Sequence, residues 1–272
     1  MTAPSARLAA TGQPSVLWAR DGAVGLATLN RPHALNALTV ELVEELEECL
    51  DEAERDPAVR AVVLAGSGEK AFCAGADLET LEREYAGGSE PDELVEALHR
   101  VYGRLERLER PVLAAVHGYC LGGGLELMLT ADLCIAADNA RFGLPEVNVG
   151  ALPGAGGTQR LPRLIGSRRA KELMFTGELI DASEAHRIGL VNRVVPAVSL
   201  LAEATAVAAG IAEKAPLALR KIKEAVNGGL GLDLEAGLAL ERACHVFLCQ
   251  TEDRREGVRA FVEKRTPRFV GR

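Results

Sequence analysis

The sequence predicts an α/β domain with much parallel strand pairing, followed by a smaller helical domain. Three observations lead to this fold class. Short apolar runs alternate with amphipathic helical patterns as far as about residue 195, glycines cluster where the apolar runs end, and only helical patterns follow Pro196. The 272 residues, of which 48% are hydrophobic, are enough for one large core with an appendage.

The chain enters the predicted domain through a hairpin. Apolar runs at Val16–Ala19 and Val24–Leu29 flank an Asp-Gly step, which favours a tight turn between antiparallel strands. Thr39 is then typical of the N-cap of a helix that runs to about Glu54, with apolar residues on one face and acids on the other. Val59–Ala65 is rich in β-branched residues and is typical of a buried strand.

The same order of elements recurs further along the chain. A polar helix over about Asp92–Arg107 precedes a strand at Val112–Val116, and a helix at Leu125–Thr130 precedes a strand at Leu133–Ala137. This alternation predicts parallel pairing. Gly87–Pro91 is the most linker-like internal stretch, and we expect a mobile loop there.

Composition therefore divides the chain into three regions. We expect a flexible tail at 1–15, a main domain at 16–196 and a C-terminal helical domain at 197–272. Proline, a glycine pair and a threonine separate the helices of the last region, which are predicted at Leu200–Lys214, Leu217–Val226, Leu232–Gln250 and Glu252–Lys264.

The overall charge and the apolar stretches argue against several classes of protein. A net charge of −8 and a pI of about 5.3 disfavour a nucleic-acid binder. The longest apolar stretch, Tyr119–Ala137, contains Glu126 and Asp132, which are costly in lipid, so we expect no membrane span. The six cysteines lie in apolar patterns without a Cys-x-x-Cys pair, and residues 1–15 lack the core of a signal peptide. We therefore expect reduced thiols in a soluble, cytoplasmic protein.

Two glycine-containing clusters each follow a predicted strand. In Ala71–Leu78, small residues around Gly75 let a ligand oxygen reach a backbone N–H, although an ordinary tight turn explains the segment as well. In His117–Glu126, three consecutive glycines precede a helix and leave its first N–H groups bare, which suits an oxyanion. Glu126 lies in the first turn, where an acid also simply stabilises a helix.

A third cluster joins Leu144–Gly150 to Pro153–Arg160. Position 159 holds no Gly to complete G-x-G-x-x-G, and no Gly-Lys-Ser/Thr follows, so nucleotide binding is not expected. The sequence also lacks a Gly-x-Ser-x-Gly elbow, a His-x-x-x-His pair and an evident Cys–His dyad. The clusters together supply bare N–H donors and two acids, Glu126 and Glu146. That set suits enolate chemistry beside a thioester, because the donors stabilise the charged oxygen while the carboxylates move protons.

In these motifs the chain resembles the crotonase (enoyl-CoA hydratase/isomerase) superfamily over nearly its whole length. The matching segments occur in the family's order: Leu29–Pro32, Ala71–Asp77, Gly118–Glu126, Pro153–Arg160 and Ala260–Arg265. The resemblance implies a crotonase-like spiral of ββα turns with a C-terminal helical domain for oligomerisation. It also implies a homotrimer or a homohexamer built from two trimers, with which the apolar stripe in Leu232–Gln250 is compatible.

The resemblance places the oxyanion donors at Ala76 and Gly123 and the hydratase carboxylates at Glu126 and Glu146. Many relatives with other activities replace one or both acids, so the presence of both favours an enoyl-CoA hydratase. Such an enzyme adds water syn to a 2-enoyl-CoA and gives the 3-hydroxyacyl-CoA, here in fatty-acid or branched-chain acyl-CoA breakdown. We favour Glu126 as base and Glu146 as proton donor, an order that the sequence leaves open. Gly154 matches a position lining the catalytic water, and no metal or cofactor is expected because coenzyme A is part of the substrate.

Coenzyme A is polyanionic and needs local cations. The resemblance places its adenine end at Arg31–Leu35 and brings Lys264 from a neighbouring subunit to its phosphates. His33 departs from the family, since many relatives carry Lys there, and Leu78–Tyr85 is expected in the wall of the acyl pocket. The residues implied in substrate binding are Arg31, His33, Ala34, Leu35, Ala74, Asp77, Leu78, Gly122, Gly154 and Lys264.

Two other readings of the family stay open. An enoyl-CoA isomerase or a methylglutaconyl-CoA hydratase-like enzyme shares the fold, although an isomerase usually needs only one of the two acids. An RNA-associated member is expected to carry a basic helix. The predicted helix at about 92–107 instead mixes charges in the way of a solvated face, with His99, Arg100, Arg104 and Arg107 against Glu93, Glu96 and Glu106. We expect no catalytic histidine.

Overall fold

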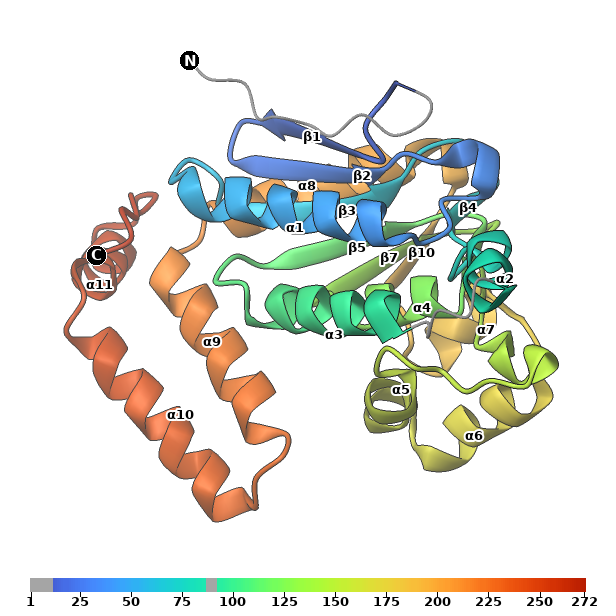
Figure 1. Ribbon diagram of the computed structural model, residues 1–272. Coiled ribbons are helices and arrows are strands. Elements are labelled where there is room, and N and C mark those ends of the chain that lie inside the picture. Colours follow the sequence, from blue (N-terminus) through green and yellow to red (C-terminus); the bar gives the residue numbers. More distant parts are fainter. Residues whose placement is uncertain (1–11, 87–91) are drawn as a thin grey trace.

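The structure, a computed structural model, describes residues 12–86 and 92–272. The predicted tail at 1–15 falls mostly, and the predicted loop at Gly87–Pro91 wholly, outside the described residues. A six-stranded sheet forms the centre of the fold (Figure 1). In spatial order its strands are β1 (Val16–Asp21), β2 (Val24–Leu29), β3 (Ala61–Gly66), β5 (Val112–Val116), β7 (Leu133–Ala137) and β10 (Arg193–Val195).

The large sheet is parallel except at its first pair. β1 and β2 form the predicted antiparallel hairpin, and the other strands pair in parallel. β3 and β5 are buried almost throughout, as expected of parallel strands covered on both faces. Parallel pairing brings the carboxyl ends of β3, β5 and β7 to one edge, and at each end the chain continues into one of the three clusters described above.

After each of these three strands, the chain adds a short strand to a second, four-stranded sheet. Its strands, in spatial order, are β4 (Ala71–Cys73), β6 (Tyr119–Leu121), β8 (Arg141–Gly143) and β9 (Ile180–Asp181). The first three are parallel, and β9 pairs antiparallel with β8. The chain thus repeats one long strand, one short strand and helices, which confirms the predicted spiral of ββα turns.

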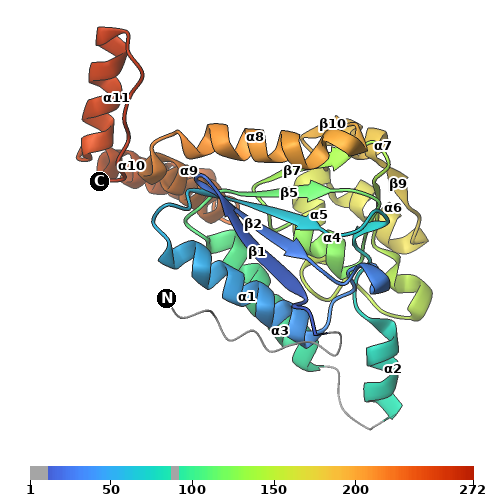
Figure 2. The same cartoon turned by 90° about the horizontal axis from the view of Figure 1, so that it is seen from above.

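Helices cover both faces of the large sheet (Figure 2). α1 (Val40–Arg55) and α3 (Asp92–Arg107) lie side by side on one face, and α8 (Leu200–Ala212) lies on the other. Thr39 caps α1 as predicted, since its hydroxyl accepts the N–H of Leu42. α8 presents an alanine at every fourth position to the sheet, which lets the helix approach closely. This helix begins beyond the predicted boundary at 196 and yet packs on the main sheet.

Shorter helices complete the main domain. They are α2 (Leu78–Ala86), α4 (Gly123–Met128), α5 (Gly157–Ile165), α6 (Ser167–Thr176) and α7 (Ala182–Arg187), with 3-10 turns η1 (Pro32–Ala34), η2 (Pro145–Val149) and η3 (Ala197–Ser199). The apolar stretch Tyr119–Ala137 is divided among β6, α4 and β7. In the part of the chain that the structure describes, no helix has the length and apolar character needed to cross a bilayer.

Three C-terminal helices extend from this core. α9 (Pro216–Gly229) and α10 (Leu234–Cys249) form a hairpin that points away from the sheets, and α11 (Glu252–Glu263) follows it (Figure 1). α9 is attached to the core through Lys223, whose ammonium donates to the Asp132 carboxylate at 2.8 Å and to the Leu105 carbonyl at 3.2 Å. Large apolar side chains stay exposed on α10 and α11: Leu234, Leu238, Val246, Phe261 and Val262.

One turn connects the start of the domain to the exit of β3. Asn36 in this turn is fully buried and adopts a left-handed φ of 55°, which Asn tolerates better than most residues with a side chain. Its Oδ1 accepts the N–H of Arg31 at 2.8 Å, and its Nδ2 donates to the carbonyls of Ser67 at 3.0 Å and Ala71 at 2.8 Å. A single amide therefore serves three backbone groups and joins two separate segments.

Asn36→Ala is expected to lower the free energy of unfolding by about 2–4 kcal/mol, because one buried and two half-buried backbone groups lose a partner. Urea denaturation followed by circular dichroism measures the change. Asn148→Ala is the control, since Asn148 is exposed and its side chain makes no hydrogen bond to a described residue. We expect the control to shift stability by less than about 0.5 kcal/mol, and equal losses in the two variants would contradict the role given to Asn36.

Candidate active site

Two backbone N–H groups converge where the short strands β4 and β6 end. Leu38 donates its N–H to the Gly75 carbonyl at 2.8 Å, and Asp77 donates to the Leu38 carbonyl at 3.0 Å, which fixes the turn on both sides of Ala76. The N–H of Ala76 itself has no acceptor among the described residues. Gly123 is the first residue of α4, so its N–H has no partner within the helix.

Glycines allow these two N–H groups to face each other. Gly75 has a φ of 100°, and a Cβ there would lie only 3.5 Å from the Gly123 nitrogen. A Cβ on Gly123 would lie 2.7 Å from the Leu38 side chain and 3.9 Å from the Ala76 nitrogen. Two donors placed in this way can bind one oxygen atom that gains negative charge. The structure therefore brings the predicted donors Ala76 and Gly123 together.

Glu126 lies in the first turn of α4 and is only 2% exposed. Its Oε1 accepts the N–H groups of Ala155 at 2.8 Å and Gly157 at 2.7 Å. Burial raises the pKa of Glu126, and these two N–H groups and the nearby Arg160 act against the rise. A Cβ on Gly157 would lie 3.0 Å from Oε1, so a glycine at this position lets the backbone approach the carboxylate.

Glu146 lies on the other side of the donor pair, in the 3-10 turn η2. A Cβ on Gly122 would lie 3.2 Å from its Oε1, so the carboxyl group lies against the residue that precedes the Gly123 donor. Its Oε2 is buried and has no hydrogen-bond partner in the described part of the chain. Burial, and to a smaller extent the charge of Glu126, raises the pKa of Glu146 to about 7. The two predicted acids therefore flank the same point with different environments.

The loop at residues 153–157 covers Glu126 and is held from outside. Arg160 forms a two-pronged pair with Glu106, at 2.6 and 2.8 Å, and also donates to the Ala155 carbonyl at 2.8 Å. The Gly154 carbonyl accepts a hydrogen bond of 2.8 Å from Nε2 of His99, which requires the ring proton on that nitrogen. A Cβ on Gly154 would meet only the Leu152 carbonyl, at 3.9 Å, so this predicted water-lining residue borders open space.

The contacts that α3 makes with this loop and with Arg160 were not predicted from the sequence. The helix was predicted to present a solvated face, and that prediction is wrong for two of its charged residues. Arg104 pairs with Glu47, Asp51 and Glu54 of α1, and Glu106 pairs with Arg160. The spacing of His99, Tyr102 and Glu106 along one helical face was the available signal.

Arg31 and Asp77, both predicted to bind substrate, bind each other. The guanidinium of Arg31 lies 2.9 Å from the Asp77 carboxylate and donates to the Ala37 carbonyl at 2.5 Å. Burial alone would raise the pKa of Asp77, but the bond from Arg31 and the N–H of Thr80 hold it below its usual range. This ion pair holds Arg31 against Asp77, the residue that directly follows the Ala76 donor. Ala74 and Leu78 flank the same turn.

A pocket of about 310 Å³ lies beside this turn, at the exit of β3. His33 and Leu35 were predicted at such a site, whereas Ala34 is not in its wall. The other side of the pocket, residues 67–70, was not predicted, although a polar run directly after a buried strand is a recognisable signal. The remaining lining residues are Pro32, Asn36, Ser67, Gly68, Glu69, Lys70 and Ala71.

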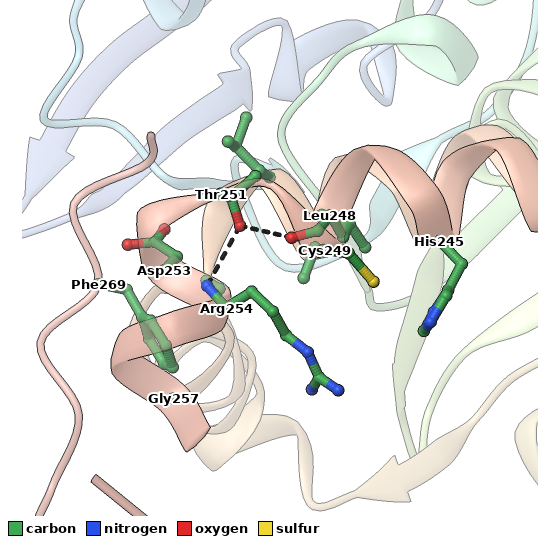
Figure 3. A pocket seen from close by; sticks show the side chains of 11 residues that line it. His245, Leu248, Cys249, Thr251, Asp253, Arg254, Gly257 and Phe269 are labelled. Atoms are coloured by element: carbon green, nitrogen blue, oxygen red, sulfur yellow. Dashed lines mark hydrogen bonds between the residues drawn. The ribbon is translucent and has the colours of Figure 1, made fainter. Parts of the chain in front are cut away.

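Lys264 lies far from these residues within one chain. It is exposed at the end of α11, on the opposite side of the molecule from α2 and β4 (Figure 1). A second cavity, of about 210 Å³, lies among the C-terminal helices (Figure 3). There Thr251 caps α11 by accepting the N–H of Arg254 and donates to the Leu248 carbonyl. None of the predicted site residues lines this cavity.

Neither a metal cluster nor a reactive thiol is evident near the carboxylates. Within residues 12–86 and 92–272, no group of three or more His, Cys, Asp and Glu side chains could hold a metal ion. Cys73 at the end of β4 is fully buried, and burial raises its pKa to about 12, so the thiol stays protonated. The carboxyl groups that lie beside the donor pair are those of Glu126 and Glu146.

Comparison with known proteins finds relatives that match nearly the whole chain. A putative enoyl-CoA hydratase/isomerase of Bacillus subtilis is 47% identical over 91% of the chain and 95% of its own length. A short-chain-enoyl-CoA hydratase of Clostridium acetobutylicum is 44% identical over 92% of the chain and 95% of its own length. The crystal structure of an enoyl-CoA hydratase from Bacillus anthracis superposes with a TM-score of 0.89 at 43% identity, covering 95% of this chain and all of that one.

Residues 19–272 match the family described as enoyl-CoA hydratase/isomerase. The match extends from β1 through α11 and includes both donor turns and both carboxylates. It confirms the resemblance seen in the sequence motifs. The chain belongs to the enoyl-CoA hydratase/isomerase family.

Proposed function

We propose that this protein is an enoyl-CoA hydratase, which adds water reversibly and syn to a 2-enoyl-CoA. One observation carries the proposal: the buried Glu126 and the half-buried Glu146, whose Oε2 is itself buried, flank a pair of neighbouring backbone N–H groups. The names of its relatives in Bacillus subtilis and Clostridium acetobutylicum agree with this activity. Breakdown of fatty-acid or branched-chain acyl-CoA is the metabolic setting we propose.

In the proposed mechanism, the N–H groups of Ala76 and Gly123 hold the thioester oxygen. Water attacks the β carbon, the electrons of the double bond move through the α carbon, and negative charge develops on that oxygen. Glu126 removes a proton from the water, and Glu146 delivers a proton to the α carbon. Overall, one O–H bond of water and the π bond between the α and β carbons are broken, one C–O and one C–H bond are formed, and the thioester is restored.

The surroundings of the two acids support this division of roles. Glu126 receives two backbone N–H bonds on Oε1, which favour its ionised form and suit a base. Glu146 has a pKa of about 7 and a buried Oε2 without a partner among the described residues, which suits a protonated donor. Hydration changes no overall oxidation state, so no redox cofactor is required.

We propose that the adenine end of coenzyme A occupies the pocket containing His33, Leu35 and Lys70. Lys70 supplies a cation beside His33, where relatives carry Lys. Lys264 of a neighbouring subunit would complete phosphate binding. We further propose the cytoplasm as the compartment, on the grounds of the six cysteines in apolar sequence patterns. The preferred acyl length is open, and a series of 2-enoyl-CoA substrates of increasing chain length measures it.

Glu126→Gln and Glu146→Gln are each expected to lower kcat by about 10²–10⁴-fold, because each variant loses one proton-transfer group without a change of shape. Loss of the ultraviolet absorbance of the conjugated thioester measures hydration. Glu93→Gln serves as the control with the same charge change, since Glu93 is exposed on α3. Wild-type turnover in either site variant would show that the acids are misassigned.

The pKa of Glu146 also predicts a dependence of stability on pH. Its ordinary value is 4.5 and its value in the fold is about 7, so between these pH values the folded state holds a proton that the unfolded chain releases. The stability due to this group is complete below pH 4.5 and is lost as the pH rises to about 7. Glu146→Gln does not titrate, so the variant is expected to gain stability relative to wild type between about pH 5 and about pH 8. Urea denaturation at both pH values measures this, and a difference independent of pH would exclude the raised pKa.

We propose that the chain assembles as a homotrimer or as a homohexamer of two trimers. The exposed apolar side chains of α10 and α11, among them Leu234, Phe261 and Val262, support burial against a neighbouring copy. Light scattering is expected to give about three or about six times the chain mass of 28.8 kDa. A monomer at micromolar concentration would contradict the proposal and would leave Lys264 without access to the site.

A further inference from the structure

Three polar side chains occupy one face of α3. His99, Tyr102 and Glu106 are separated by three and four residues, so they lie on the same side of the helix. Other charged residues of the helix point elsewhere, since Arg100 and Arg104 pair with acids of α1. The helix therefore has one polar face toward α1 and another toward the active site.

Tyr102 is the central member of this set and is completely buried. Its hydroxyl donates to the Gly123 carbonyl at 2.7 Å. Burial raises the pKa of Tyr102 well above its ordinary value, so the hydroxyl keeps its proton and remains a donor. The bond fixes the first turn of α4, and that turn carries both the Gly123 N–H and Glu126. A phenylalanine would fill the same space without this bond, so the hydroxyl does more than fill the core.

His99 and Glu106 act on the other half of the site, the loop at residues 153–157. His99 lies one helical turn before Tyr102 and donates to the Gly154 carbonyl at 2.8 Å. Glu106 lies one turn after it and holds Arg160, which in turn donates to the Ala155 carbonyl at 2.8 Å. The N–H groups of that same loop bind Oε1 of Glu126. Tyr102 thus contacts the segment that carries Gly123 and Glu126, whereas His99 directly and Glu106 through Arg160 hold the loop that binds Glu126.

We propose that His99, Tyr102 and Glu106 form a positioning stripe, in which Tyr102 sets the oxyanion donor at Gly123 while His99 and Glu106 set the loop that orients Glu126. None of the three touches the reacting atoms, so they are positioning residues rather than catalytic ones. The inference rests on the proposed hydratase reaction for its effect on turnover. Its geometric part concerns thioester polarisation, which can be measured without any turnover.

Tyr102→Phe tests the half of the stripe that sets the donor. We expect kcat to fall about 10- to 100-fold with KM changed less than about twofold, because the donor is displaced rather than removed. The second readout is a bound cinnamoyl-CoA with a para-dimethylamino group, whose absorbance moves to the red when the thioester oxygen is polarised. That red shift is expected to shrink in Tyr102→Phe. Tyr119→Phe, which removes an exposed hydroxyl, is the matched control and is expected to keep both values.

Glu106→Gln and His99→Ala test the half of the stripe that holds the loop. Each is expected to lower kcat about tenfold and to leave the red shift of the probe unchanged, because the donor pair is intact. His99→Gln keeps an N–H donor and is expected to recover part of the loss. Glu96→Gln, an exposed position on the same helix, is the control for the charge change. These side chains are more exposed than Tyr102, so this half remains testable if Tyr102→Phe does not fold.

The outcomes separate the positioning stripe from the hydratase proposal. Wild-type kcat or a wild-type red shift in Tyr102→Phe would overturn the role of Tyr102, and wild-type kcat in both loop variants would overturn the roles of His99 and Glu106. If the wild-type protein binds the probe but hydrates no 2-enoyl-CoA, the hydratase proposal fails. In that case the red shift in Tyr102→Phe still decides whether Tyr102 sets the donor. A wild-type protein that binds no probe would overturn both proposals.

Discussion

The buried carboxylate of Glu126 imposes the main constraint on this structure. A charge at 2% exposure is unfavourable unless hydrogen bonds replace the lost water, and here two backbone N–H groups do so on a single oxygen. Backbone can come this close only where side chains are absent, which explains the glycine at 157, where a Cβ would lie 3.0 Å from the carboxylate. The loop must then be held from its outer side, and Arg160 provides that support.

The spiral makes this arrangement attainable from distant parts of the sequence. Parallel pairing places the ends of β3, β5 and β7 at one edge, and three successive turns add the Ala76 donor, the Gly123 donor with Glu126, and Glu146. The short strands β4, β6 and β8 pair with one another and set the spacing between these turns. The large sheet thus supplies stability, and the small sheet supplies the geometry of the site.

Much of this fold is predictable from the sequence, and the reasons for failure are physical. The helix α3 has the bounds expected of it because its apolar spacing is repeated several times, and the strands β5 and β7 have theirs because each is one continuous apolar run. The strands β4, β6 and β8 are only three residues long, too short for a period, so β4 and β6 appeared only within glycine-containing clusters and β8 was not predicted. The assignment of Ala76, Gly123, Glu126 and Glu146 to one site came from family motifs. The pairing of Glu106 with Arg160 could not be predicted, because periodicity identifies the face of a helix but not the segment opposite it.

The two glutamates differ in the number of backbone N–H groups that donate to their carboxylates. Glu126 is buried and Glu146 is half-buried, and burial raises the pKa of both. The loop that approaches Glu126 offers it two donors from another segment, whereas the buried Oε2 of Glu146 has no donor among the described residues and the charge of Glu126 adds to the effect of burial. The charge of Glu126 disfavours ionisation of Glu146, whereas the two N–H donors on Glu126 favour its own charged form. The loop geometry that fixes Glu126 therefore also contributes to the raised pKa of Glu146, for which burial is the larger cause. A change that moves the loop, including one made in the positioning stripe on α3, is expected to act on both carboxyl groups.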